Sequence, residues 1–392
     1  MTRRQATLAC AAALTGFAAE RDASEPVRLC RVPESGLQPL VAVDDMGYLH
    51  MVYYTGDPRK GNLLYVKSED GGTSLSRPIQ VNSDPGSAIA MGTIRGAQIA
   101  LGKGGRIHVG WNGSKPEGPL NPDSGQLGMP MLYTRMNDAG NGFEPQRNLM
   151  KHSFGLDGGG SIAADRSGNV YVAWHGIGDT EASSAEKEGE ARRRVWVARS
   201  QDEGRSFLAE EKAWSEKTGA CGCCGMKIFA DRRGSLFALY RSATQSIHRD
   251  IYLLISTGEQ KSFRGRLLHK WDVNACPMSS MDIAENGPRV VGAWETGGQV
   301  FWAQLGGGAI QPISAPGEGK GRKHPRVVVS RSGDILLVWT EGTGWQKGGS
   351  LAYQVFDLKG NPLSKQGRVD GIPAWSFATA TARTDNGFLV IY

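Results

Sequence analysis

The sequence predicts an all-β chain folded as a single β-propeller, and three observations support this prediction. An apolar strand, a polar turn with glycine and a second alternating strand recur about every fifty to sixty residues, which is the period of a four-stranded propeller blade. Glycine is abundant, at 54 of 392 residues, and charged residues make up 21%, as is typical of a turn-rich globular protein. No amphipathic helical pattern of comparable strength interrupts the repeat.

Seven copies of this hairpin follow one another along the chain. The glycines of their turns are Gly47, Gly105, Gly168, Gly234, Gly287, Gly333 and Gly387. A further strand follows each of the first six hairpins, as in NLLYVKS (62–68) and RVWVARS (194–200). The seventh copy ends at Tyr392, and the segment PVRLCRV (26–32) could complete it and close the ring. We therefore predict one domain over residues 26–392 with seven four-stranded antiparallel blades, the last one incomplete, or six blades as the alternative.

A second repeated turn follows several third strands. The segments Ser68–Leu75 and Ser200–Phe207 fit the pattern Ser-x-Asp-x-Gly-x-Ser/Thr-aromatic, with Leu75 departing at the last position, and Met136–Phe143 is a partial copy. The aspartate can accept backbone N–H bonds, and the glycine permits a positive φ. These turns resemble Asp boxes, also called BNR repeats, and the chain resembles the sialidase-like β-propeller superfamily over nearly its full mature length. Because Asp boxes occur in enzymes and non-enzymes alike, the resemblance implies a fold but no particular activity.

The N-terminus resembles a secretory leader. Arg3 and Arg4 precede an apolar stretch from Ala6 to Ala19 that is too short to span a membrane. We expect residues 1–19 to be a signal peptide, the mature protein to be secreted or periplasmic, and no later segment to cross a membrane. The net charge is only +6, and the one compact basic run, at 192–194, follows an acidic stretch and is expected to be a solvated loop. Nucleic acid is therefore not an expected partner.

The loops of a propeller divide between its two ends. Turns between strands 1 and 2 and between strands 3 and 4 share one end, and the strand 2–3 loops share the other with the crossings between blades. The unusual residues of this chain fall on the second end, where ACGCCGM (220–226) and ACPM (275–278) precede inner strands. A propeller mouth lined by polar groups is the default binding site. We expect this mouth to bind or process a carbohydrate or another small polar ligand.

The resemblance implies one specific form of this mouth, that of an exo-sialidase-like glycosidase. Enzymes of that family clamp a carboxylate with three arginines and use a tyrosine–glutamate pair as nucleophile and an aspartate as acid/base. Arg31-Val32-Pro33 resembles the family's Arg-Ile-Pro start. The candidates are Arg241, Arg249 and Arg326 for the clamp, Asp57 for the acid/base, Tyr240 with Glu295 or Glu341 for the nucleophile, and Trp345 to stack on a sugar ring. These residues do not make a complete constellation in the sequence, so enzymatic activity stays open.

Five cysteines follow the leader: Cys30, Cys221, Cys223, Cys224 and Cys276. Five is an odd number, so disulfides alone cannot account for them all. The runs 220–226 and 275–278 precede the inner strands of consecutive blades, whose entrances are neighbours. We therefore expect at least one of the three clustered cysteines to meet Cys276.

Two interpretations of the cysteines stay open. One is a structural disulfide between the two crossings. The other is a soft-metal or redox site for Cu or Zn, in which Met226, Met278 and one of His175, His248 and His324 could join the thiols. The alternatives for the whole chain are accordingly a non-enzymatic propeller with a metal or redox cluster and a protein-interaction propeller with structural disulfides.

Overall fold

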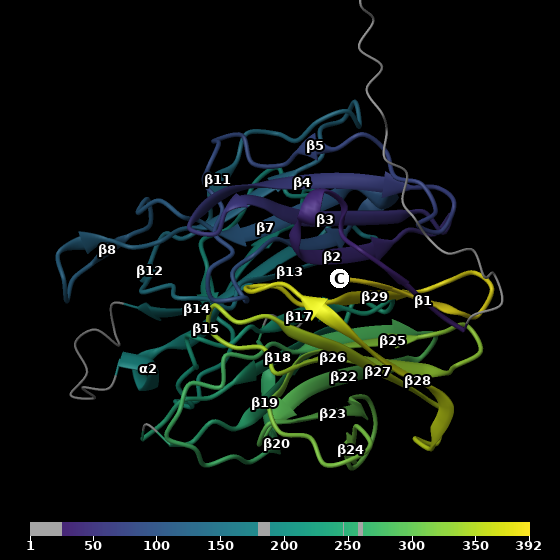
Figure 1. Cartoon of the computed structure of the whole chain (residues 1–392). Coiled ribbons are helices and arrows are strands. Elements are labelled where there is room, and N and C mark those ends of the chain that lie inside the picture. Colours follow the sequence, from purple (N-terminus) through teal and green to yellow (C-terminus); the bar gives the residue numbers. More distant parts are fainter. Residues whose placement is uncertain (1–25, 179–188, 246, 258–261) are drawn as a thin grey trace, which may run out of the picture.

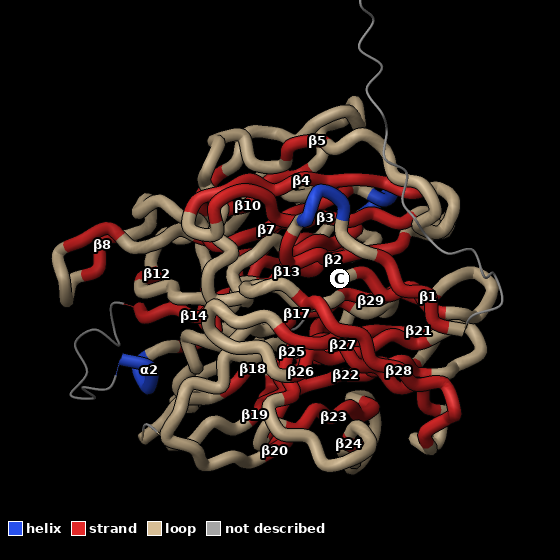
Figure 2. The backbone as a smooth tube through the Cα atoms, in the orientation of Figure 1, coloured by secondary structure: helices blue, strands red, loops and turns tan. Residues whose placement is uncertain are grey.

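The chain folds as a seven-bladed β-propeller (Figure 1). The computed structural model describes residues 26–178, 189–245, 247–257 and 262–392, so the predicted leader lies outside the described residues. Figure 2 shows strands in every part of the molecule and only short helical turns between them. The first strand of each blade packs against the first strands of both neighbouring blades, which closes an inner ring around the axis. Among the described helices, none has the length and apolar character needed to cross a membrane.

Six blades are complete four-stranded antiparallel sheets, with the strands in sequence order from the axis to the rim. Blade 1 comprises β2 Leu37–Val43, β3 Leu49–Asp57, β4 Lys60–Ser68 and β5 Ile79–Gln80; blade 2 comprises β6 Gln98–Leu101, β7 Ile107–Asn112, β10 Met131–Arg135 and β11 Arg147–Asn148; blade 3 comprises β13 Ser161–Ala164, β14 Val170–Gly178, β15 Arg194–Ser200 and β16 Glu211–Lys212. Blade 4 comprises β17 Lys227–Ala230, β18 Leu236–Arg241, β19 Ile251–Ser256 and β20 Arg264–His269; blade 5 comprises β21 Asp282–Asn286, β22 Arg289–Thr296, β23 Gln299–Gln304 and β24 Ile313–Ser314; blade 6 comprises β25 Arg322–Val329, β26 Ile335–Glu341, β27 Gly349–Phe356 and β28 Pro362–Ile372.

The remaining elements are short and lie in the connections. They are η1 Pro33–Ser35, η2 Lys103–Gly105, α2 Gly189–Arg192, the hairpin of β8 Leu120–Asn121 and β9 Gln126–Leu127, and β12 Ser153–Phe154, which pairs with the end of β14. The β8–β9 hairpin and α2 belong to strand 2–3 loops and project from the same end of the propeller, at the left in Figure 1. We call this end the mouth and the opposite end, which carries the 1–2 and 3–4 turns, the turn end.

Blade 7 closes the ring with strands from both chain termini. It consists of β29 Thr379–Ala382, β30 Phe388–Ile391 and β1 Val27–Cys30. The predicted seven blades, with the last completed by the N-terminal segment, are therefore confirmed, and the six-blade alternative is wrong. Among the described strands, the prediction of antiparallel pairing fails at this one place, because β1 lies parallel to β30. The cause is that β1 must end at the mouth, where β2 begins, and β30 also runs toward the mouth.

The turns that resemble Asp boxes fasten neighbouring blades to each other at the turn end. Asp202 accepts hydrogen bonds from the Ser206 amide, at 2.9 Å, and from the hydroxyls of Ser206 and Ser200, at 2.6 and 2.7 Å. Phe207, which closes this turn of blade 3, packs edge-on against Tyr133 of blade 2 with ring centroids 4.8 Å apart. The turn thus holds its own backbone and places an aromatic side chain in the interface with the preceding blade.

We predict that Asp202→Ala lowers the free energy of unfolding by about 1 kcal/mol, because the turn loses several hydrogen bonds at a site that water can reach. The pKa of Asp202 is lowered to about 2, since the bonds from Ser206 and Ser200 outweigh the opposing effect of burial. The unfolded pKa is about 3.9, so this stabilisation is present above about pH 4 and is lost as the pH falls toward 2. Thermal melting at pH 7 and pH 2.5 measures both effects.

Asp138→Ala is the matched control for this prediction. Asp138 occupies the same position in the partial copy, but its carboxylate contacts the side chain of Arg106, at 2.7 Å, and is exposed. We expect a smaller loss of stability for this variant. Equal losses in both variants, or a loss of any mouth function in Asp202→Ala, would contradict the structural role of the turn.

Candidate functional site: a thiol cluster at the propeller mouth

Two blade crossings meet at the mouth and bring the clustered cysteines together. The segment 220–226 precedes β17, and the segment 276–281 precedes β21, the first strand of the next blade. The Gly225 amide donates to the Ser279 carbonyl at 2.9 Å, which ties the two segments to each other. The Cys221 amide donates to the Arg241 carbonyl at 2.9 Å, which holds the cysteine run against the end of β18. The predicted meeting of these entrances is therefore present.

Three sulfur atoms form a compact group inside this junction. Cys221 Sγ lies 3.3 Å from Cys223 Sγ and 3.5 Å from Cys224 Sγ, and all three sulfurs lie within 4.8 Å of one another. Cys221 and Cys224 are fully buried, and Cys223 is half-buried. Cys276 is exposed and does not belong to the compact group, but its thiol interacts with that of Cys223.

The sulfur spacing differs from that of a disulfide. A disulfide requires an S–S distance near 2.05 Å, and the described cysteines are free. Sulfurs that share one tetrahedral metal ion with bonds of about 2.3 Å lie about 3.8 Å apart. The observed distances of 3.3 and 3.5 Å are within a few tenths of an ångström of that edge, so a small outward shift would suffice to admit an ion.

Two buried arginines flank the sulfurs. Arg249 bonds to Glu190 of α2 at 2.8 Å, yet its Nε and Nη1 atoms are buried without a hydrogen-bond acceptor among the described residues. Arg241 is fully buried, bonds to Glu295 Oε2 at 2.9 Å, and leaves its Nε atom without an acceptor. Buried donors normally find partners. The positive charge of Arg241 favours the thiolate form of Cys224, and that of Arg249 favours the thiolate form of Cys276.

The pKa values of the four thiols are shifted in different directions. Burial raises the pKa of Cys224, but S–H bonds from Cys221 and Cys223, the Arg241 guanidinium and the Ser279 backbone together hold it well below its usual range. An S–H bond from Cys223 likewise lowers the pKa of Cys276. Bonds to the neighbouring sulfurs and burial raise the pKa of Cys223. The pKa of Cys221 is also raised, by its bond to Cys224 and by burial, against the lowering effect of Cys223. The three sulfurs of the compact group therefore cannot all ionise unless a cation joins them.

Glycines let the backbone close around the sulfurs. A side chain at Gly222 would lie 2.5 Å from the Arg193 guanidinium, and one at Gly225 would lie 3.0 Å from the side chain of Ser280. Gly159 has a φ of +79° and lies against the Cys224 carbonyl and the His175 ring, so it has neither room for a side chain nor a backbone conformation that suits one. The two glycines of CGCCG are thus needed because a side chain at either position would crowd the neighbouring Arg193 or Ser280.

The other predicted metal ligands lie in different surroundings, and several have other partners. His175 is fully buried beside Gly159, and both its ring nitrogens lack a partner among the described residues. Burial, with Arg193 adding to the effect, lowers the pKa of His175 to about 4, so the ring is neutral. His248 bonds instead to Asp272, at 2.6 Å, and His324 to Ser280, at 3.3 Å. Met226 packs in the apolar core between blades 3 and 4. Met278 is half-buried two residues after Cys276 with a φ of +47°.

The three arginines proposed as a carboxylate clamp each have an acidic partner within the chain. Arg241 and Arg249 flank the thiols, as described above. Arg326 lies over the Phe377 ring, and its Nη1 atom lies 3.7 Å from the Asp282 carboxylate. All three are buried. The clamp assignment stays a prediction, but the described partners already engage each guanidinium.

The proposed tyrosine, glutamate and aspartate groups also have other partners. Tyr240 stacks on Tyr252 and bonds to the Thr218 hydroxyl at 2.6 Å, and burial raises its pKa. Glu341 binds two arginine side chains and the Trp339 indole. Asp57 is exposed at the β3–β4 turn, where it accepts the Arg59 amide at 2.8 Å. None of these contacts joins the tyrosine to a glutamate, as the glycosidase hypothesis requires.

Trp345 lies in the strand 2–3 loop of blade 6 and is 48% exposed. Its ring approaches Gly92, in the crossing from blade 1 to blade 2, where a side chain would lie 3.4 Å from the indole. The loop therefore reaches over the mouth of the three-stranded blade 7. This position keeps the aromatic face available to solvent at the rim of the mouth.

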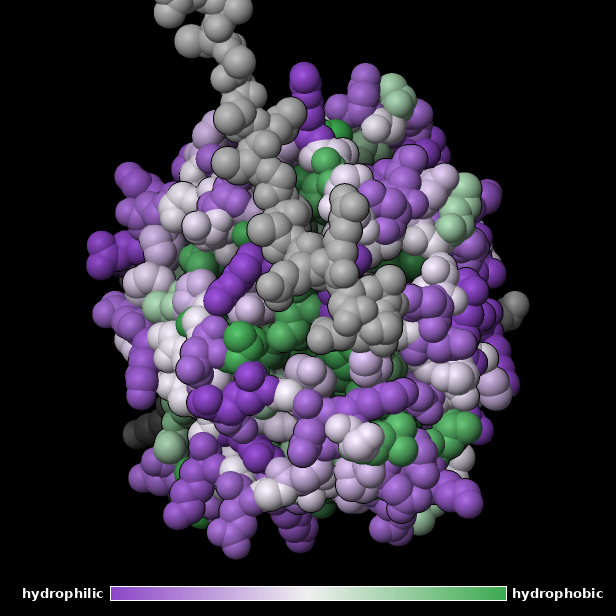
Figure 3. Space-filling model, turned by 45° about the vertical axis from the view of Figure 1, so that its right-hand side comes forward, coloured by the Kyte–Doolittle hydropathy of each residue, from purple (hydrophilic) through white to green (hydrophobic). Residues whose placement is uncertain are grey.

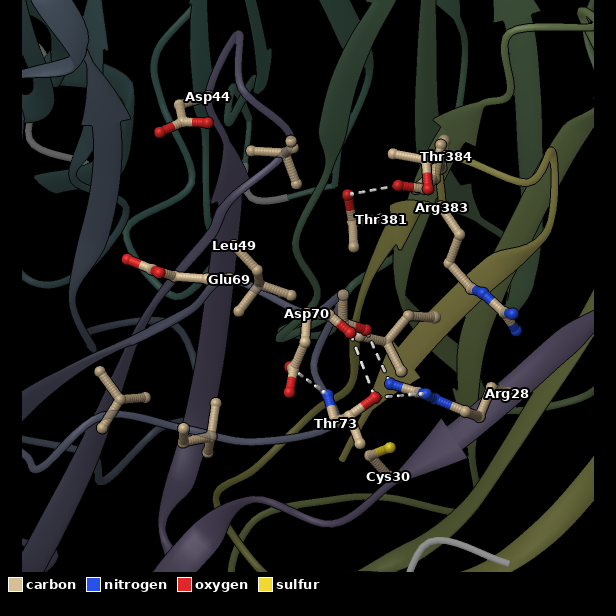
Figure 4. A pocket seen from close by; sticks show the side chains of 18 of the residues that line it. Arg28, Cys30, Asp44, Leu49, Glu69, Asp70, Thr73, Thr381, Arg383 and Thr384 are labelled. Carbon is tan, nitrogen blue, oxygen red and sulfur yellow. Dashed lines mark hydrogen bonds between the residues drawn. The ribbon is translucent and has the colours of Figure 1, made fainter. Parts of the chain in front are cut away.

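A cavity of about 1700 Å³ lies away from the mouth thiols, none of which lines it. It is lined by turn-end residues and by β1, and Figure 4 shows Arg28, Asp70 and Thr73 joined across it. In Figure 3, apolar side chains appear in a hollow within a hydrophilic rim on the face turned toward the turn end. The carboxylates here serve their own turns: Asp70 accepts the Thr73 and Ser74 amides, and Asp44 those of Met46 and Tyr48. Size alone therefore does not make this cavity the functional site.

Sequence reasoning missed Glu190 and misjudged the basic run beside it. Glu190 accepts the Gly222 amide at 3.0 Å and bonds to Arg249, so it joins α2 to the cysteine run. The expectation of a solvated loop at 192–194 is wrong for Arg194, which is 5% exposed and donates to the Ala191 carbonyl. Nothing in the sequence of the acidic stretch before this run indicated that the Glu190 carboxylate would bind Arg249 and the cysteine run.

Comparisons with known proteins identify the class of fold. No family model and no curated protein matches the chain. Among solved structures, it is similar to the Hadza microbial sialidase Hz136, with a TM-score of 0.53, 11% identity and 83% of this chain covered. The chain spans 66% of the length of that sialidase. The resemblance to sialidase-like β-propellers is thereby confirmed for the fold.

Two other solved structures support the same class. A protein of unknown function from Dyadobacter fermentans DSM 18053 has a TM-score of 0.51 at 13% identity and covers 82% of this chain and 94% of its own. An α-L-arabinanase from Penicillium chrysogenum, complexed with arabinobiose, has a TM-score of 0.50 at 16% identity and covers 84% of this chain and 95% of its own. Identities this low establish a shared architecture and leave the site to be argued from its own residues.

We predict that Glu295→Ala destabilises the protein by about 3–5 kcal/mol, because it leaves the buried Arg241 without its counter-charge. Chemical denaturation measures the change. Asp57→Ala is the control, since it removes an exposed carboxylate at the same end and should alter stability by less than about 0.5 kcal/mol. A Glu295→Ala variant as stable as the parent would show that Arg241 and Glu295 do not depend on each other.

Proposed function

We propose that the chain is an exported, sialidase-like β-propeller whose mouth binds a soft metal ion, Cu(I) or Zn(II), through Cys221, Cys223 and Cys224. One observation carries this proposal: three sulfurs, two of them fully buried and one half-buried, lie within 4.8 Å of one another at the junction of two blades. Thiolates are the ligands that select Cu(I) and Zn(II) in proteins. The propeller supplies the rigid support that a metal site needs.

The charges around the sulfurs support a cation at their centre. Without one, only some of the thiols ionise, because adjacent thiolates repel each other in a medium of low dielectric constant. Arg241 and Arg249 each use one carboxylate and keep buried N–H groups that thiolate sulfur can accept. Among the described residues, neither ring nitrogen of the neutral His175 has a hydrogen-bond partner, so this ring is a candidate for a further ligand or for an outer hydrogen bond.

A structural disulfide is the competing interpretation of the same residues. It suits an exported protein, in which oxidation is the rule, and the contact between Cys223 and Cys276 offers one pairing. It leaves Cys221 and Cys224 as buried thiols beside unmatched arginine donors, whereas a metal ion uses all three sulfurs of the compact group.

A carbohydrate ligand is the second candidate function. Trp345 favours it, because a half-exposed indole at the rim of the mouth can stack on a sugar ring. The structural neighbours named a sialidase and an arabinanase act on glycans, which supports the same class of ligand. Binding of arabino-oligosaccharides or sialosides that is lost in Trp345→Ala would establish this function; the absence of binding by the parent protein would exclude these ligands.

We predict that the reduced protein binds one equivalent of Cu(I) or Zn(II) under anaerobic conditions. Cys221→Ser or Cys224→Ser should lower the affinity for the metal by about tenfold to a hundredfold or more, because even residues that only support a metal ligand have effects of that size. Competition with a chromophoric chelator measures the affinity. Cys30→Ser is the matched control, because Cys30 is also a buried free cysteine but lies in β1 of blade 7.

Thiol counting separates the metal from the disulfide. A metal site releases three additional reactive thiols when the ion is stripped by chelator, without any reductant. A protein whose mouth thiols become reactive only after reduction, whether or not chelator is present, would contradict the metal proposal.

A further inference from the structure

The four mouth thiols differ in how deeply they are buried. Cys276 is exposed, Cys223 is half-buried, and Cys221 and Cys224 are fully buried. The contacts follow the same order, because Cys276 interacts with Cys223, Cys223 Sγ lies 3.3 Å from Cys221 Sγ, and Cys221 Sγ lies 3.5 Å from Cys224 Sγ. The exposed thiol of Cys276 is therefore connected to the two fully buried thiols through the half-buried Cys223.

Cys276 differs from the other three in its setting. It lies outside the compact group of sulfurs and follows two exposed residues, Asn274 and Ala275, while the next residue, Pro277, is buried and anchors the loop. A thiol in this place can meet a molecule in solvent and still touch the buried set. It is not needed to complete that set.

The ion that suits a relay of sulfurs is Cu(I). Soft thiolate ligands select it, and it accepts two or three sulfur ligands, so it can move from one to the next without a complete coordination shell. Zn(II) is held almost always by four ligands in structural sites, and the compact group supplies only three thiols. Arg249, beside these sulfurs, provides fixed positive charge for the anionic copper–thiolate species that such a transfer passes through.

We propose that Cys276 is the entry ligand of a copper-transfer path: it accepts Cu(I) from a thiolate-bearing donor and passes the ion through Cys223 to the buried site. This inference rests on the proposed metal-binding function. The substrate is a Cu(I)–thiolate complex of a small thiol.

Each step of the transfer is an exchange of ligands. A thiol of this chain forms one Cu–S bond, one Cu–S bond to the donor breaks, and the proton of the entering thiol moves to the departing thiolate. The Cys276–copper bond then breaks as the bond to Cys223 forms. Copper remains Cu(I) throughout and no electrons are transferred, so neither an oxidant nor a reductant is consumed.

The test uses Cu(I)–glutathione as the donor, under anaerobic conditions and with the full mature chain. Stopped-flow absorption of the copper–thiolate chromophore gives the transfer rate, and competition with bicinchoninate gives the equilibrium affinity. We expect Cys276→Ser to slow transfer by about tenfold or more, because exchange requires an accessible thiolate, while its affinity falls far less than that of Cys224→Ser. Cys30→Ser should change neither quantity.

The possible failures are distinguishable. A parent protein that binds neither Cu(I) nor Zn(II) overturns the proposed function, and with it the path. A parent that binds Zn(II) but not Cu(I) overturns the path alone, as does a Cys276→Ser variant with an unchanged rate or with an affinity loss equal to that of Cys224→Ser. Should that variant fold poorly, alkylation of the exposed Cys276 in the folded parent protein provides the same comparison: slowed transfer supports the path, and an unchanged rate overturns it.

Discussion

The hydrogen bond from the Gly225 amide to the Ser279 carbonyl, at 2.9 Å, joins two neighbouring blade entrances, and the mouth site depends on it. It exists because the first strands of all seven blades pack around one axis, so the segments that enter β17 and β21 must run side by side. Closure of the ring by β1 and β30 fixes this arrangement. Cysteines more than fifty positions apart in sequence thereby become neighbours without a local motif to bring them together.

The charges of the buried arginines and thiols determine which ligands this junction can bind. The buried arginines beside the sulfurs each have one carboxylate partner, Glu295 for Arg241 and Glu190 for Arg249. Each arginine still has buried N–H groups without an acceptor among the described residues, and these groups favour a negative charge on sulfur. Clustered thiolates repel one another, so they in turn favour a bound cation. The same arginines would bind a carboxylate of a sugar only after leaving the partners they now hold, at a substantial desolvation cost.

The repeat predicted the fold well, because strand, turn and strand recur with a period that few other architectures share. It could not predict the parallel β1, since a pattern of apolar residues gives no strand direction. The meeting of Cys276 with the cysteine run followed from blade order. The surroundings of the cysteines did not follow from it. Glu190 approaches from α2 and Glu295 from the end of β22, and only the folded chain reveals that they bind Arg249 and Arg241, two of the arginines proposed as a clamp. Tyr240 likewise alternates into the blade core, where Tyr252 and Thr218 engage it.

The central claim is that the mouth is a sulfur-coordinated metal site. X-ray absorption spectroscopy of protein loaded anaerobically with one equivalent of Cu(I) tests it most directly. The account predicts a first shell of sulfur atoms at about 2.2–2.3 Å with at most one nitrogen neighbour. A shell made only of nitrogen and oxygen, or one that is unchanged when Cys221 and Cys224 are both replaced by serine, would contradict it.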